Sequence, residues 1–161
     1  MRKIIPFIAV ALLLVSACSS IDCPLNNLVY SSFALYGGDG RADTLRDTLT
    51  ISTNRTDGSD SVLINRDTRV TGFTLPVSYA QPQDIFFVEV KGEDIVTLDT
   101  LTVSKESRPH FESVDCGPSF FHTITAVSCT TSAVDSVVIN NPDVNYDTSN
   151  KNFHIYFKHR N

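Results

Sequence analysis

Apolar positions fall into one continuous run near the start of the chain and many short runs after it. Beyond residue 27, runs rich in Val, Ile, Thr, Phe and Tyr alternate with clusters of Gly, Asn, Asp and Pro. This pattern is typical of β-strands joined by turns. Strands are expected at residues 28–36, 48–53, 61–65, 70–77, 85–90, 95–103, 120–129, 134–140 and 153–158.

Alternation within these runs indicates half-buried strands. In residues 48–53, Leu49 and Ile51 point to one face while the intervening Thr and Ser residues point to the other. No helical stripe occurs after the first run. Eight or nine strands in a single domain, residues 28–161, predict an all-β fold. We expect an antiparallel β-sandwich, immunoglobulin-like or a related Greek key, with a barrel as the alternative.

The apolar residues of the expected strand 95–103 change parity along the strand. Val96 and Leu98 lie on one parity and Leu101 and Val103 on the other, so a β-bulge is expected between them.

A short element of Asp, then Ser or Thr, then a strand-like run also recurs. We interpret it as the ordinary hydrogen-bonding chemistry of strand starts. The element begins at Asp47, Asp60, Asp99 and Asp135.

The first apolar run has the features of an export signal. Arg2 and Lys3 precede residues 4–15, a run too short for a transmembrane helix, which needs about 20 residues. Small residues follow and end at Cys18, which resembles the lipobox of bacterial lipoproteins. We expect residues 1–17 to be cleaved, Cys18 to carry acyl chains such as palmitate, and residues 18–27 to form a tether. An ordinary secreted protein is the alternative.

Ser19 follows the proposed lipidated cysteine, where an Asp would favour retention at the inner membrane. An outer-membrane location is therefore expected, with the lipid as the membrane attachment. Asp22 is the only acidic residue near the anchor, so the periplasmic and the external face both stay open. Loss of Arg2 and Lys3 changes the net charge from −5 to −7. This acidic balance argues against nucleic acid as a partner.

Three cysteines remain once Cys18 carries lipid, in a compartment where disulfides persist. Cys23 and Cys116 both lie in irregular segments marked by Pro and Gly, and we favour a disulfide between them. Cys129 would then be a free thiol at the end of a strand. Other pairings stay open on sequence alone.

Candidate metal ligands are few. Residues 140–147 are rich in oxygen ligands, and Asp143, Asn145 and Asp147 are the candidates for calcium, although their spacing is not that of an EF-hand. A long polar turn is the favoured interpretation. His110, Cys116 and His122 match no standard zinc spacing. His122 is expected to point into apolar surroundings, and His154 to solvent.

No nucleophile elbow, zinc-protease motif or phosphate-binding loop occurs in the chain, so neither an enzyme nor a cofactor is expected. The chain contains no Trp, which weakens a sugar-binding interpretation, although five Tyr residues keep it open.

Several strings resemble an uncharacterised lipoprotein family, a domain of unknown function, of Bacteroides-like bacteria. They include residues 23–27, 110–117, 121–125, 140–146 and 153–157. The resemblance covers most of residues 18–161 and implies no activity. We expect a noncatalytic, lipid-anchored binding or scaffold protein of the cell envelope, with an outer-membrane β-barrel protein as candidate partner. The alternatives are a glycan- or calcium-binding lipoprotein receptor and an envelope hydrolase.

Overall fold

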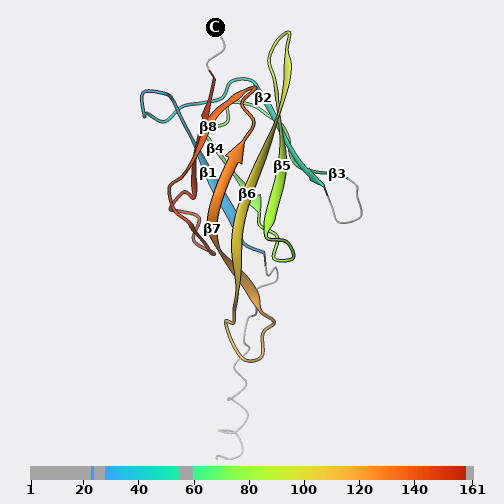
Figure 1. Cartoon of the computed structure of the whole chain (residues 1–161), viewed down its shortest axis with the longest axis vertical. Helices are drawn as coiled ribbons and strands as arrows, with labels where there is room; N and C mark the ends of the chain where they lie inside the picture. The colour runs from blue at the N-terminus through green and yellow to red at the C-terminus, as the bar shows by residue number, and fades with distance from the viewer. Residues whose placement is uncertain (1–22, 24–27, 55–59, 159–161) are drawn as a thin grey trace, which may run out of the picture.

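The fold is all-β. The computed structural model describes Cys23, residues 28–54 and residues 60–158, and within these ranges it contains ten strands and no helix. The strands form two open sheets in a sandwich-like arrangement, which confirms the expected fold class (Figure 1). The expected signal segment, Cys18 and the rest of the tether apart from Cys23 lie outside the described residues.

The smaller sheet has four strands and the larger has six. The smaller sheet has the order β4 (Gly72–Pro76), β1 (Tyr30–Tyr36), β10 (Phe153–Phe157), β8 (Val134–Ile139). The larger sheet has the order β3 (Asp60–Asp67), β2 (Thr48–Asn54), β5 (Gln83–Lys91), β6 (Val96–His110), β7 (Ser119–Cys129), β9 (Asp143–Val144). Neighbouring strands are antiparallel except for β1 and β10, which pair in parallel.

The core lies between the sheets and combines an aromatic row with aliphatic rows. In the smaller sheet, Phe33 of β1 stacks on Phe73 and Phe153, with ring centroids 4.7 and 4.5 Å away. In the larger sheet, Leu49 and Ile51 are fully buried, as their alternation predicts. The other buried aliphatic residues of this sheet are Val88, Val90, Leu101, Val103, Ile124 and Val144.

The bulge expected between Val96 and Leu101 is absent. The register between β5 and β6 is continuous from Val96 to Ser104, so parity is kept along this part of β6. Val96 and Leu98 are instead exposed, and Asp99 occupies the buried parity next to Leu101. The prediction was wrong because it assumed that every apolar residue of this strand faces the core.

A register shift does occur further along, where β6 pairs with β7. Ser104 pairs with Ala126 and Lys105 with Ile124, so Thr125 is an extra residue on β7. The shift lets His122 and Ile124 face the core on one side of the bulge, while Val127 and Cys129 pack against it on the other. A bulge of this kind reverses the parity of the bulged strand.

Strand β6 is longer than the sequence pattern indicates. It continues from Val103, the expected end, to His110, through a polar stretch that contains Pro109. Beyond Ser104, β5 no longer pairs with β6, and only β7 does. An edge of this kind tolerates proline because no partner requires the missing N–H. The strand therefore runs most of the length of the molecule.

Cys23 joins the domain at one end of this long strand. A disulfide links it to Cys116 in the β6–β7 loop (residues 111–118), the pair favoured from the sequence. The β5–β6 hairpin lies at the opposite end of the long axis (Figure 1). The 15 residues of β6 span about 50 Å between these ends, at roughly 3.3 Å per residue.

The buried carboxylate of Asp99 holds the β7–β8 connection, one of the places where the chain crosses between the two sheets. Its oxygens accept hydrogen bonds from the backbone N–H groups of Ser132, Ala133 and Val134, at 2.6, 2.7 and 2.9 Å. The hydroxyl of Thr130 donates a fourth, at 2.8 Å. Burial alone would raise the pKa of Asp99, but the hydrogen bonds from the three backbone N–H groups and Thr130 outweigh it and lower the pKa.

We expect Asp99→Asn to destabilise the fold by about 3 kcal/mol at pH 7, because the amide cannot accept every one of these hydrogen bonds. The lowered pKa means that the ionised group stabilises the fold above the unfolded value of about 3.9. This contribution is lost as pH falls through the folded-state pKa. Urea unfolding at pH 7 and in acid should therefore show the variant and wild type converging at low pH.

Asp135→Asn is the matched control, since Asp135 belongs to the same recurring sequence element but is exposed. Its unfolding midpoint should stay close to that of wild type. Equal losses of stability in the two variants at pH 7 would show that the carboxylate of Asp99 has no special role.

Candidate functional site

A buried ion pair lies on the inner face of the larger sheet. Lys105 Nζ is 2.7 Å from the carboxylate of Asp84, and both side chains are buried. Lys105 also donates to the carbonyl of Gln81 at 3.0 Å, and Asp84 accepts from the N–H of Ser78 at 3.3 Å. Burial raises the pKa of Asp84, and the hydrogen bond and charge of Lys105 offset part of the rise. The charged groups of Lys105 and Asp84 therefore both have their partners inside the fold.

His122 lies near this pair and is buried, in agreement with its expected inward orientation. Its Nδ1 is 2.9 Å from the hydroxyl of Ser107, across the β6–β7 ladder. Burial, with the charge of Lys105 adding to it, lowers the pKa of His122 to about 4. A Ser–His pair can supply a nucleophile and a base. Here, however, the charged neighbour is a cation, which opposes the imidazolium that catalysis would form.

The candidate calcium ligands lie in β9 and the irregular segment after it, and each has a partner within the fold. Asp143 forms an ion pair with Arg108 at 3.5 Å. The side-chain oxygen of Asn145 accepts from the N–H of Asp147 at 2.7 Å, and Asp147 accepts from the N–H of Ser149 at 2.9 Å. Hydrogen bonds from the Ser149 hydroxyl and N–H lower the pKa of Asp147. In the described ranges, no three His, Cys, Asp or Glu residues are grouped to hold a metal ion.

The remaining histidines and cysteines are dispersed. Cys116 is in the disulfide, while His110 contacts Glu112 at 3.1 Å and stacks on Phe121. These residues and His122 therefore do not form a zinc site. His154 is only half-buried and packs on Tyr36, and His159 lies outside the described residues.

Cys129 is a free thiol that packs partly against the core. Burial, with the nearby charge of Asp99 adding to it, raises the pKa of Cys129 to about 11. The thiol therefore stays protonated at neutral pH, and a protonated thiol is a poor nucleophile and a poor metal ligand.

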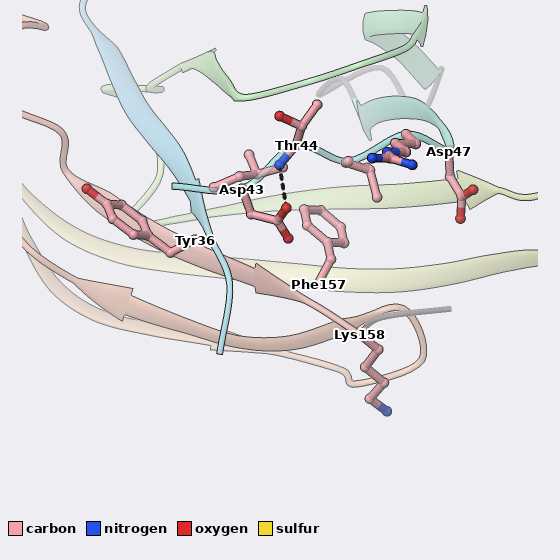
Figure 2. Close-up of a pocket in the computed structure, with 9 residues that line it drawn as sticks. Tyr36, Asp43, Thr44, Asp47, Phe157 and Lys158 are labelled. Atoms are coloured by element: carbon pink, nitrogen blue, oxygen red, sulfur yellow. Dashed lines mark hydrogen bonds between the residues drawn. The ribbon is translucent and has the colours of Figure 1, made fainter. Parts of the chain in front are cut away.

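One hollow of about 330 Å³ lies at the ends of β1 and β10, beside the loop before β2. Figure 2 shows Phe157 and Asp43 facing its interior, where Asp43 accepts a hydrogen bond from the N–H of Thr44 at 2.7 Å. Lys158 at the rim donates to the carbonyl of Thr131. The charged side chains around this hollow are of both signs, so no single class of ionic ligand is favoured.

A second groove, of about 530 Å³, has a more apolar lining and an aromatic wall. Tyr79 is 60 % exposed and stacks on Phe120 with ring centroids 4.8 Å apart. Leu28, Pro76 and Ile85 add apolar surface, and the polar lining residues are Thr53, Asn54, Ser78, Gln81 and Asp84. An aromatic face beside amide side chains is suited to a ligand with one apolar and one hydrogen-bonding side.

A third exposed feature is the end of the β5–β6 hairpin. Ile95, Val96 and Leu98 are each more than half exposed, and we call them the hairpin patch. Across the ladder, Val96 faces Lys91 and Leu98 faces Glu89. Glu93 and Asp94 in the turn are exposed as well. The patch is therefore apolar with a mainly acidic rim.

Sequence reasoning missed the ion pair and the groove. Asp84 is followed by a strand-like run, and Lys105 belongs to a polar stretch, so neither carries a local signal of burial. Tyr79 was one of five tyrosines with no distinguishing neighbour, and its partner Phe120 is distant in sequence. The hairpin patch did leave a signal, the parity of Val96 and Leu98, which was wrongly interpreted as evidence of a bulge.

Comparison with known proteins links the chain to one family. In the described part of the chain, no helix is long and apolar enough to cross a membrane. Neither the curated proteins nor the solved structures contain a significant match. A family model does match residues 48–157, which is most of the chain and runs from β2 to β10. The chain therefore belongs to DUF6452, a family of unknown function.

Proposed function

We propose that this chain is a lipid-anchored, noncatalytic binding or scaffold protein of the bacterial cell envelope. The hairpin patch carries the proposal, because three large apolar side chains lie exposed at the end of the molecule opposite the β6–β7 loop, which the disulfide joins to Cys23 (Figure 1). Exposed apolar groups at a protruding tip are costly unless a partner covers them. The acidic rim of the patch suits a protein partner with an apolar pocket and basic groups beside it.

Two further observations support a role in binding rather than catalysis. Asp99, Asp84 and Lys105 are buried and engaged in hydrogen bonds that hold the fold together. The imidazole of His122 is hydrogen-bonded to the hydroxyl of Ser107, and burial and the charge of Lys105 lower its pKa. These groups have the chemistry of a catalytic site but are committed to structural contacts.

The anchor is supported by the sequence before the domain. Arg2, Lys3 and the apolar run lead to Cys18, and Ser19 follows it. We propose acylation of Cys18 and attachment to the outer membrane of a Bacteroides-like bacterium. Two or three acyl chains hold a protein firmly, whereas one chain binds only marginally.

Metabolic labelling with palmitate tests the anchor. Wild type should incorporate label, and Cys18→Ala should lose it completely, because no other residue would be acylated. Cys129→Ala is the control, since it removes the free thiol of the domain and should keep the label. Equal labelling of wild type and Cys18→Ala would exclude lipidation at this cysteine.

Crosslinking of the native protein in envelope fractions, followed by mass spectrometry, tests the partner. We expect one stoichiometric envelope protein, with an outer-membrane β-barrel protein as the candidate. The double variant Val96→Asp with Leu98→Asp should lower its recovery at least about tenfold, a change that corresponds to roughly 1.4 kcal/mol of binding energy. Both residues are exposed, so the fold should be retained.

Val62→Asp is the matched control, because Val62 on the edge strand β3 is 56 % exposed, as is Val96. It should recover the partner at the wild-type level. Unchanged recovery in the double variant would rule out the hairpin patch as the docking site, and so would equal loss in the control.

A second candidate function is glycan binding in the groove beside Tyr79. The stacked and exposed ring of Tyr79, with Asn54 and Gln81 nearby, has the combination of aromatic and amide groups that a sugar ring needs. This function becomes the better candidate if the native protein captures no stoichiometric partner.

Binding of the intact protein to a panel of envelope glycans tests this candidate. Tyr79→Ala should weaken binding by about tenfold. A ring contact contributes roughly 0.5–1.5 kcal/mol beyond the contribution of the area that it buries, and the variant loses both. Tyr30→Ala is the control, because Tyr30 is exposed but does not line the groove. No binding by wild type, or equal weakening by the two variants, would exclude the groove as a glycan site.

A further inference from the structure

The β6–β7 loop presents two exposed apolar side chains beside the disulfide. Val114 is 98 % exposed and Phe111 is 60 % exposed. The N–H of Cys116 donates to the carbonyl of Ser113 at 3.3 Å, which closes a turn with Val114 at its corner. The turn therefore holds an apolar side chain outward at the end of the molecule.

The disulfide places this loop close to the proposed anchor. The Cα atoms of Cys23 and Cys116 are 5.5 Å apart, so the chain enters the domain beside the loop. Cys18 precedes Cys23 by five residues, which reach at most about 18 Å when fully extended. The loop thus cannot move far from the residue that we propose to be acylated, whereas the hairpin patch lies about 50 Å away along β6.

The charges of the loop indicate which kind of lipid surface it fits. The carboxylate of Glu112 contacts His110, and Asp115 is exposed. The nearest basic side chain along β6, Arg108, contacts Asp143. An anionic surface is therefore unfavourable, and contact must come from the apolar side chains. Phe at a membrane interface gains free energy by placing its ring at the boundary between headgroups and acyl chains.

We propose that Phe111 and Val114 insert into a zwitterionic lipid interface next to the acylated cysteine, which makes the β6–β7 loop a second membrane contact. This inference rests on the proposed lipid anchor. The disulfide keeps the anchor and the loop close together, so both contact the membrane and together fix the orientation of the domain. The long strand β6 then carries the hairpin patch away from the bilayer.

Tryptophan fluorescence tests the insertion without background, because the chain contains no Trp. The lipidated full-length protein carrying Phe111→Trp is reconstituted into phosphatidylcholine vesicles with or without bromine on the upper acyl chains. Bromine should quench its emission at least about twofold, as expected for a ring at the interface. Adding Val114→Ser to Phe111→Trp should reduce this quenching.

Leu98→Trp is the control for an exposed apolar site at the opposite end, and its emission should be unaffected by the brominated lipid. Nonreducing peptide mapping confirms that each variant keeps the Cys23–Cys116 disulfide. Equal quenching of Phe111→Trp and Leu98→Trp in an acylated protein would overturn the insertion and leave the anchor intact. Intact mass without acyl chains would overturn both the anchor and the insertion.

Discussion

The buried carboxylate of Asp99 fixes the path of the chain from the larger sheet to the smaller one between β7 and β8. The chain leaves the six-stranded sheet at Cys129 and begins β8 in the four-stranded sheet at Val134. The N–H of Thr130 still donates to the carbonyl of Thr100 on β6, but those of Ser132, Ala133 and Val134 donate to a side chain. A buried N–H without a partner is costly. Asp99 supplies acceptors for these three N–H groups and for the Thr130 hydroxyl. An aliphatic residue at this inward position would pack well but would leave the connection unsatisfied.

Buried polar groups recur in the fold, and each is matched with a partner. Lys105 and Asp84 form their ion pair toward the β6–β7 loop, and Asn152 bonds to Ser32 on the parallel strand β1. In the described residues, no buried side-chain nitrogen or oxygen lacks a hydrogen-bond partner. The polar chemistry of the interior therefore specifies the structure, whereas the contacts proposed with a partner and with lipid use exposed apolar groups at the two ends.

Local alternation predicted most strands because it reports burial directly, as at Leu49 and Ile51. It failed where burial depended on distant partners. The second half of β6 is polar and was not predicted, since it is ordered by pairing with β7 and not by a buried stripe. The two-residue strand β9 was too short to leave a pattern. Val96 and Leu98 do alternate as residues of a strand, but alternation does not indicate which face of the strand packs against the core. The aromatic wall of the groove was not predicted either, because Tyr79 and Phe120 come into contact only in the folded chain.

The parallel pairing of β1 with β10 has a consequence for how the domain forms. Ser32 and Asn152 are hydrogen-bonded although they are 120 positions apart. Strand β1 therefore cannot complete its pairing until β10 is present. Contacts of such long sequence separation slow folding, because the loop between them must close first. A chain released from its N-terminus onward can assemble the ladder from β2 through β7 in order, but the smaller sheet stays incomplete until β10 is available. The domain therefore acquires its full aromatic core only after β10 has been synthesised, and deletion of β10 would leave Phe33 with Phe73 but without Phe153 as a stacking partner.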